Sequence, residues 1–513
     1  MEESERSSDL SINLMNGVGY ELPSDPDDGV RIDEFLSRNS GKPVVVVQGL
    51  GFVGGVMSIV CANAKSCEYA VIGVDLPTPE SYWKICAIND GVLPLKSSDP
   101  KVEEYFRRAR NKGNLYATFD NYAFTHADVV IVDVNLDVQK RSSKDLELLG
   151  FDVEMEPLSR AIETIARNCK PDVLVLVETT VPPGTCEKIV NPIFERELAA
   201  RNLSTDLFRL GHSYERVMPG PNYIDSIQNF YRVYSGINTE SAEATEKFLK
   251  TIIRIDEYPL TRLKSTNATE MAKVLENSYR AMNIAFMVEW SRFAEEAGVD
   301  LYEVVNAIRM RDTHSNMMLP GIGVGGYCLT KDPLLASWAR QALFDSTEGL
   351  IQSEQGVRIN DQMPLFAFNY LMQQVRPVKL RGLRVLLLGI TYRGDVGDTR
   401  YSPVELFYKL LIRAGCEVRA HDYFIENWSE CDIGVETDLE AALAQDFDIL
   451  AITTGHSAYR NNAKLLAALS RMPKCVVYDT IGLLSEAELA EIGRSHRVCV
   501  LGRGGAAIKT IDS

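Results

Sequence analysis

The sequence of 513 residues lacks several features that would assign it to a class at once. It has no apolar run as long as a membrane-spanning helix, and its polar, acidic N-terminus has neither a secretory apolar segment nor an arginine-rich transit pattern. The ten cysteines and six histidines are scattered, without the paired spacing of a zinc site. We therefore expect a cytoplasmic protein with reduced thiols, no metal site and no membrane partner.

Basic residues are also too few for one class of partner. The formal net charge of -17 argues against nucleic-acid binding, which requires a basic surface. An anionic small molecule is still compatible, because a helix N-terminus and a few local cations can hold a phosphate. The length predicts two or three domains.

Short apolar runs alternate with helix-like segments in two parts of the chain, which predicts parallel α/β sheets. The first series opens with VVVVQGLGFVGG at residues 44–55, and the second with RVLLLGITYRG at residues 384–394. Residues 265–298, between them, have helical apolar spacing. We expect an α/β fold with two Rossmann-like parallel-sheet domains joined by a central helical region that contains a long helix.

The first glycine-rich turn has the pattern of a dinucleotide-binding site. In Gly49-Leu50-Gly51-Phe52-Val53-Gly54, the first glycine permits a tight turn, the second lets a pyrophosphate approach, and the third allows close helix packing. Asp75 ends the next predicted strand, where a carboxylate would bind the adenosine ribose and repel a 2′-phosphate. The pattern predicts NAD rather than NADP, and the alternative is a glycine-rich turn without a ligand.

Cys328 lies in PGIGVGGYCLTKDP, residues 320–333. A single cysteine is most often a small core residue, and Cys328 by itself could be one. Lys331 would favour its thiolate, and Asp332 could orient a water or relay a proton. Beside a nicotinamide cofactor such a thiol can add to an aldehyde, and the thiohemiacetal can then be oxidised to a thioester. Cys328 is therefore a candidate nucleophile.

A polar stripe follows one face of the predicted long helix. Lys273 and Asn277 are one turn apart, and Arg280 and Asn283 continue the stripe. A solvated face is the commoner explanation of such spacing. The alternative is a largely buried helix whose polar stripe meets a ligand or partner, which is favoured by the apolar neighbours Met271, Ala272, Val274, Leu275, Ala281 and Ile284.

With these motifs the chain resembles the UDP-glucose/GDP-mannose dehydrogenase family, over about residues 43–502. The motifs occur in the family's order: GLGFVG, ETTVPPGT, YERVMPG, EMAKVLENSYRAMNIA, PGIGVGGYCLTKDP and GITYRGDVGDTRYSP. The resemblance implies a four-electron oxidation of the C6 alcohol of a nucleotide sugar to a carboxylate with two NAD+. It also implies a homodimer or higher homo-oligomer through the central helices.

Residues 1–40 form a polar extension, which we expect to be mobile or loosely docked. For the rest of the chain the resemblance implies an NAD-binding domain over 41–255, a central helical region over 256–375 and a UDP-sugar-binding domain over 376–513. It assigns Cys328 the role of nucleophile and Lys273 that of oxyanion stabiliser. The full catalytic set is Cys328, Lys273, Asn277, Asp332, Glu215 and Thr180. The implied cofactor-binding residues are Gly49, Gly51, Phe52, Val53, Gly54, Asp75, Thr180 and Arg400. The implied substrate-binding residues are Glu215, Arg216, Lys273, Asn277, Arg280, Gly323, Gly325, Tyr392 and Arg393.

The chain departs from the family's pattern at three points. Val134-Asn135-Leu136-Asp137 replaces the usual turn near the nicotinamide, Tyr392-Arg393 replaces Phe-Lys, and the arginine before the sugar loop is absent, with Arg311 as the candidate substitute. The long-helix motif and PGIGVGG resemble the branch that acts on UDP-N-acetylhexosamines, whereas GYCLTKD resembles the UDP-glucose branch. We expect a UDP-N-acetylhexosamine substrate, with UDP-glucose as the alternative, and a product used for polysaccharide or glycoconjugate synthesis.

Two other classes share part of the pattern. A single-step dehydrogenase of the 3-hydroxyacid or 6-phosphogluconate type shares the first domain and the Lys–Asn pair but has no use for Cys328. A catalytically silent nucleotide-binding protein has no reason to keep the full catalytic set. We therefore expect an enzyme.

Overall fold

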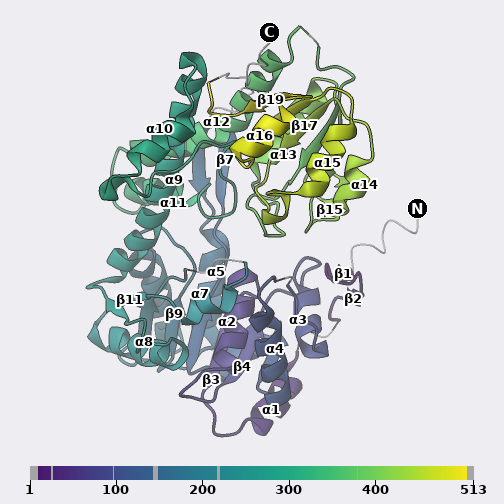
Figure 1. The fold of residues 1–513 in the computed structure, drawn as a ribbon. Helices are drawn as coiled ribbons and strands as arrows, with labels where there is room; N and C mark the ends of the chain where they lie inside the picture. The colour runs from purple at the N-terminus through teal and green to yellow at the C-terminus, as the bar shows by residue number, and fades with distance from the viewer. Residues whose placement is uncertain are drawn as a thin grey trace, which may run out of the picture. The chain divides into compact units, whose positions relative to one another are not determined.

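The computed structural model describes residues 10–24, 27–95, 97–142, 148–216, 220–377 and 379–504. The chain forms two compact units, both drawn in Figure 1. The first unit comprises residues up to 139, 152–274 and 338–347, and the second comprises residues 140–151, 275–337 and 348 onward. Each contains a mainly parallel sheet, which confirms the predicted α/β fold class. The predicted domain boundaries stay a prediction.

The first unit is built on an eight-stranded sheet of order β12-β11-β10-β9-β6-β3-β4-β5. Neighbouring strands are parallel except β10 and β11. The strands are β3 (Val44–Gln48), β4 (Ala70–Val74), β5 (Leu115–Thr118), β6 (Val129–Val132), β9 (Leu174–Val177), β10 (Arg209–His212), β11 (Val233–Gly236) and β12 (Thr261–Arg262). The helical segments between them are α2 (Phe52–Ala62), α3 (Tyr82–Asp90), α4 (Pro100–Lys112), η2 (Asn121–His126), α5 (Glu156–Asn168), η3 (Cys186–Val190), α6 (Asn191–Ala200), α7 (Tyr223–Gln228) and α8 (Thr239–Ile252).

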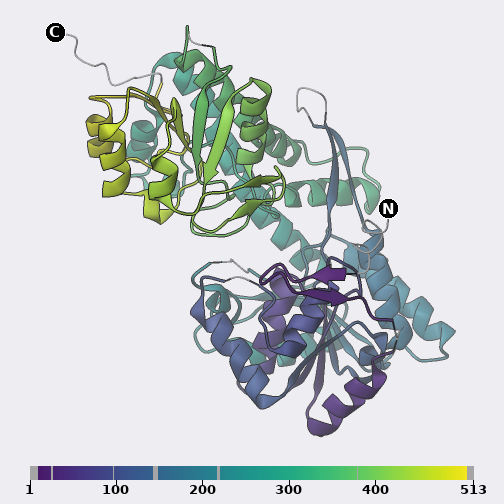
Figure 2. The same cartoon turned by 90° about the vertical axis from the view of Figure 1, so that its right-hand side faces the viewer.

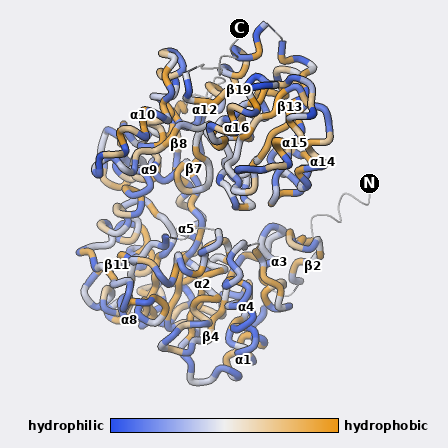
Figure 3. Tube along the Cα trace, viewed as in Figure 1, coloured by the Kyte–Doolittle hydropathy of each residue, from blue (hydrophilic) through white to orange (hydrophobic). Residues whose placement is uncertain are grey.

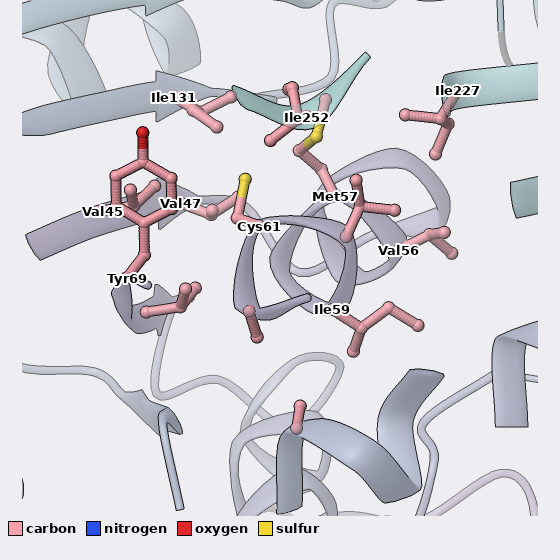
Figure 4. Close-up of a cluster of buried hydrophobic side chains, with 14 of the residues drawn as sticks. Val45, Val47, Val56, Met57, Ile59, Cys61, Tyr69, Ile131, Ile227 and Ile252 are labelled. Carbon is pink, nitrogen blue, oxygen red and sulfur yellow. The ribbon is translucent and has the colours of Figure 1, made fainter. Parts of the chain in front are cut away.

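The core of this unit explains its apolar runs. Strands β4, β6 and β9 are buried along their whole length, as is typical of a parallel sheet covered on both faces. Figure 4 shows Met57 and Cys61 of α2 in one cluster of buried side chains with Val47 of β3. Burial raises the pKa of the Cys61 thiol well above its ordinary value, so this cysteine is a core residue.

The described part of the N-terminal extension is folded. Strands β1 (Leu10–Ile12) and β2 (Gly19–Glu21) form an antiparallel hairpin, drawn as the dark purple arrows of Figure 2. Helix α1 (Gly29–Arg38) follows and buries Ile32 and Phe35. The expectation of a loosely docked extension is therefore wrong for these residues. The segment is polar overall, but a few of its side chains, such as Ile32 and Phe35, are buried.

Four elements run through both units. They are the paired strands β7 (Val138–Ser142) and β8 (Leu148–Val153) and the helices α9 (Thr266–Ala297) and α11 (Asp332–Ala342). Helix α9 has 32 residues, which confirms the predicted long helix. No helix in the described part of the chain is long and apolar enough to cross a membrane.

The second unit has a five-stranded, fully parallel sheet of order β14-β13-β17-β18-β19. Its central strands are apolar, and β13 is orange in Figure 3. The strands of this unit are β13 (Arg384–Leu388), β14 (Glu417–His421), β15 (Asn427–Trp428), β16 (Ile433–Gly434), β17 (Ile449–Ile452), β18 (Val476–Asp479) and β19 (Arg497–Val500). Its helical segments are α10 (Leu301–Ile308), η4 (Asp312–His314), α12 (Ile351–Gln374), α13 (Pro403–Arg413), α14 (Leu439–Leu443), η5 (Ser457–Tyr459), α15 (Ala463–Arg471) and α16 (Glu486–Ile492).

Candidate functional site

The glycine-rich turn after β3 leaves space at one position only. A Cβ on Gly49, whose φ is +98°, would lie 2.6 Å from the carbonyl oxygen of Asp133, and one on Gly54 would collide with the carbonyl oxygen of Gly49. Around Gly51, by contrast, nothing lies within 4 Å of an added Cβ. Gly51 directly precedes α2, which begins with Phe52 and Val53. The open position at a helix N-terminus fits the pyrophosphate of NAD.

Asp75 follows β4 and is bound to the same turn. Its Oδ2 accepts a hydrogen bond from the Leu50 backbone N–H at 3.0 Å and lies 3.4 Å from Lys84 Nζ. Its Oδ1 accepts the backbone N–H of Leu76 at 2.8 Å. A carboxylate held in this way beside the glycine turn fits the ribose hydroxyls of NAD.

Lys273 and Glu215 form a buried pair in the first unit. Lys273 Nζ donates to the Glu215 backbone carbonyl at 2.7 Å and lies 3.5 Å from Glu215 Oε1. The ammonium also lies 5.4 Å from the ring centroid of Tyr214. Thr180, which follows β9, is buried, whereas Arg216 packs its guanidinium 5.4 Å from the Phe230 ring. The segment YERVMPG continues into residues 217–219, which lie outside the described residues.

A second buried charge pair is hydrogen-bonded to the backbone next to the first. Arg232 forms an ion pair with Glu178, and both side chains are almost completely buried. Arg232 Nη1 also donates to the backbone carbonyl of Tyr214 at 3.3 Å, next to Glu215. The sequence analysis missed this pair. Glu178 opens the motif ETTVPPGT, but nothing in the sequence indicated Arg232 as its partner.

Burial shifts the pKa values of three groups near these charge pairs, Glu178, Asp133 and His212. It raises the pKa of Glu178 to about 7, although the nearby Arg232 opposes the shift. Burial and the neighbouring Glu178 also raise the pKa of Asp133 well above its ordinary value. Burial and the charge of Lys273 lower the pKa of His212 to about 3, so this histidine is neutral at physiological pH. The cluster therefore holds carboxyl groups that can carry protons near neutral pH.

Cys328 lies in the turn that leads into α11. All ten cysteines belong to the described part of the chain, and Cys328 is the exposed one. The backbone N–H groups of Lys331 and Asp332 donate to the Cys328 carbonyl at 3.2 and 2.9 Å. The Asp332 carboxylate is fully buried and accepts from Asn277 Nδ2 at 2.6 Å and from Lys331 Nζ at 3.1 Å. An exposed thiol thus precedes a fixed carboxylate by one turn.

Asn360 of α12 fastens the glycine-rich segment that precedes Cys328. Its Oδ1 accepts the Val324 N–H at 2.7 Å, and its Nδ2 donates to the Val324 carbonyl at 2.8 Å. A Cβ on Gly323, whose φ is +115°, would approach the Asn360 carbonyl at 3.3 Å. The sequence analysis missed Asn360, which carries no motif.

Tyr392 explains two further glycines of this segment. A Cβ on Gly325 would lie 2.8 Å from the Cβ of Tyr392, and one on Gly326 would lie 2.7 Å from its ring. Tyr392 and the two glycines are therefore packed closely together, which the sequence analysis did not predict.

The two arginines near Tyr392 differ in their surroundings. Arg393 is exposed. Arg400 Nε and Nη2 donate to the Asp398 carboxylate at 3.0 and 2.7 Å.

Helix α9 has an exposed apolar face, so the expectation of a largely buried helix is wrong for that face. Arg280 is exposed as well, and Asn283 is half-buried. The exposed apolar side chains, which we call the α9 stripe, follow helical spacing and are Met271, Leu275, Tyr279, Phe286, Trp290 and Phe293.

Within the described residues no group of histidine, cysteine, aspartate and glutamate side chains could hold a metal ion.

Residues 43–253 match the NAD binding domain of the UDP-glucose/GDP-mannose dehydrogenase family, residues 267–360 its central domain and residues 386–486 its UDP binding domain. The chain belongs to this family. It is an oxidoreductase, a nucleotide-sugar dehydrogenase that uses NAD, and the expected family and cofactor are confirmed.

This dehydrogenase has relatives in the UDP-N-acetylhexosamine branch, as the resemblance predicts. The UDP-N-acetyl-D-mannosamine dehydrogenase of Pyrococcus horikoshii is 31% identical over 81% of this chain and 90% of the relative. That of Methanocaldococcus jannaschii is 29% identical over 90% of this chain and 97% of the relative. A solved UDP-D-ManNAc dehydrogenase structure from Pyrococcus horikoshii superposes with a TM-score of 0.74 and 27% identity, over 90% of this chain and 99% of that chain.

Proposed function

We propose that the protein oxidises the C6 alcohol of a UDP-N-acetylhexosamine to the uronic acid in two NAD-dependent steps. The observation that carries the proposal is the exposed Cys328 thiol one turn before the buried Asp332 carboxylate, which Asn277 and Lys331 hold. A single-step dehydrogenase would need no such thiol. When bound, NAD+ supplies the hydride acceptor, once for each two-electron step.

The residues of the chain would handle the protons and the aldehyde. Lys273 would stabilise the alkoxide that forms as the C6 hydroxyl loses its proton, since a fixed ammonium acts most strongly on developing negative charge. The Cys328 sulfur would add to the aldehyde, giving a thiohemiacetal whose oxidation yields a thioester and whose proton is released to solvent. Asp332 and Glu215 would assist water in cleaving the thioester, which regenerates the thiol and releases the carboxylate.

The substrate assignment rests on sequence similarity, in the motifs and over most of the chain. The motifs of α9 and of the glycine-rich segment resemble those of the UDP-N-acetylhexosamine branch, and the relatives reported above are named for UDP-N-acetyl-D-mannosamine. UDP-glucose remains the alternative because of the GYCLTKD motif. The product would serve polysaccharide or glycoconjugate synthesis.

We also propose a homodimer or higher homo-oligomer through the α9 stripe. Six large apolar side chains on one helix face are unusual for a monomer surface, and a self-complementary face on a single helix suits a two-fold interface.

The role of Cys328 can be tested by Cys328→Ser, with Cys431→Ser in the second unit as the matched control. We expect the Cys328→Ser enzyme to release no uronic acid while it binds NAD+ with unchanged affinity, measured by chromatography of the product and by calorimetry. The control should retain full turnover. Full turnover by Cys328→Ser would exclude the thiol from the mechanism.

A further inference from the structure

The N-terminal hairpin, which precedes the region matched to the family, is anchored beside the carboxylate Asp75. Ser11 of β1 is 0% exposed. Its hydroxyl donates to the Pro79 carbonyl at 2.7 Å and accepts the Trp83 backbone N–H at 2.8 Å. Pro79 lies four residues after Asp75, and Trp83 is the second residue of α3, which begins at Tyr82. The next residue of that helix, Lys84, contacts the Asp75 carboxylate. The hairpin therefore holds the stretch of chain that follows Asp75, up to the first turn of α3.

Helix α1 is anchored to β5, the strand that pairs with β4 beside Asp75. Asp28, which precedes α1, accepts hydrogen bonds from the hydroxyl groups of Tyr116 and Thr118, both at 2.7 Å. Thr118 ends β5, and its backbone carbonyl accepts the Asp75 N–H at 3.2 Å. Phe35 of α1 stacks on Tyr116 with 5.6 Å between ring centroids. One buried carboxyl thus links the extension to the strand that bonds Asp75.

We propose that residues 10–24 and 27–38 position Asp75 for the adenosine half of NAD, with Ser11 and Asp28 as positioning residues. The inference rests on the proposed role of Asp75 as the ribose-binding carboxylate. The contacts of the extension go to the chain that follows Asp75 and to the strand β5 that bonds Asp75, and they order this part of the site before the cofactor binds. A pre-ordered site loses less conformational freedom on binding, which raises affinity without any contact to the ligand.

The test uses the full chain with Ser11→Ala and Asp28→Asn, and Leu14→Ala on the exposed side of the hairpin as the control. Calorimetry measures the Kd of ADP-ribose and of UDP, and steady-state kinetics give the KM for NAD+ and kcat. We expect the Kd of ADP-ribose and the KM for NAD+ to rise about threefold to tenfold, as the loss of one buried hydrogen bond allows, with UDP binding and kcat unchanged. The control should match the wild type.

Two results would overturn the inference, and they are distinguishable through Asp75→Ala. If Asp75→Ala weakens ADP-ribose but Ser11→Ala and Asp28→Asn only lower the thermal midpoint, the extension stabilises the fold and does not position Asp75. If Asp75→Ala leaves ADP-ribose affinity unchanged, the ribose contact itself is wrong and the inference fails with it. Should Asp28→Asn fail to fold, Ser11→Ala alone decides, because that substitution changes no charge.

Discussion

Glu270→Gln should change how the stability of the first unit depends on pH. The Glu270 side chain, on α9, is fully buried. Its Oε2 accepts the Gly184 N–H at 2.6 Å, and its Oε1 accepts the Cys186 N–H at 2.8 Å. The buried carboxyl group therefore connects the loop that follows Thr180 to the helix that carries Lys273.

The magnitude follows from the pKa of this carboxyl. Burial raises the pKa of Glu270 from 4.5 to about 7, although the bonds from Cys186 and Gly184 oppose the shift. The folded protein thus keeps this proton to a higher pH than the unfolded chain does. Its stabilising contribution is complete below pH 4.5 and is lost as the pH rises to about 7, a change of about 3 kcal/mol. The glutamine of the variant does not titrate, so this part of the pH dependence disappears.

The assay is calorimetric unfolding of the wild type, Glu270→Gln and the exposed control Glu243→Gln at several pH values from 5 to 8. Glu178 titrates in the same range in all three proteins, so its contribution cancels. About 2.5 kcal/mol of the change falls between the ends of this range, so the wild type should lose roughly 5 to 10 °C in thermal midpoint relative to Glu270→Gln. Parallel curves for the two proteins would mean that Glu270 is already ionised at pH 5, and would refute the reasoning.

Three further results are expected at the proposed site. Lys273→Ala should lower kcat about 100-fold or more with little change in KM, because an oxyanion partner acts mainly in the transition state; a rise confined to KM would make Lys273 a binding residue. Asp332→Asn should slow thioester cleavage, so that intact-protein mass spectrometry detects a covalent adduct on Cys328; normal kcat without an adduct would contradict its role. Phe286→Glu should shift the particle mass in light scattering towards the monomer, and an unchanged mass would remove the α9 stripe from the interface.

The sheets and the cofactor turn could be predicted because their physical requirements appear locally in the sequence. A parallel strand covered on both faces is an uninterrupted apolar run, as in β4 and β6. A tight turn against a helix admits only glycine, as at Gly49 and Gly54. The docking of the extension could not be predicted in this way, because it depends on Ser11 meeting backbone groups about 70 residues further along.

The site was predictable only in part, for the same reason. The family motifs indicated Cys328 and Asp332, and the structure adds the hydrogen bond between Asp332 and Asn277. The ion pair between Glu178 and Arg232 joins residues 54 positions apart, with no periodicity that would reveal it. In the sequence both partners are ordinary charged residues, and only their burial in the folded protein distinguishes them from surface charges.

The central claim, a four-electron oxidation through Cys328, is tested most directly by counting NADH formed per sugar consumed. Limiting UDP-N-acetylmannosamine, UDP-N-acetylglucosamine, UDP-N-acetylgalactosamine, UDP-glucose and GDP-mannose would each be supplied separately with excess NAD+. The account predicts two NADH per molecule of a UDP-N-acetylhexosamine, with the uronic acid as product. One NADH per sugar would mean that the aldehyde is released, and would contradict the role of Cys328.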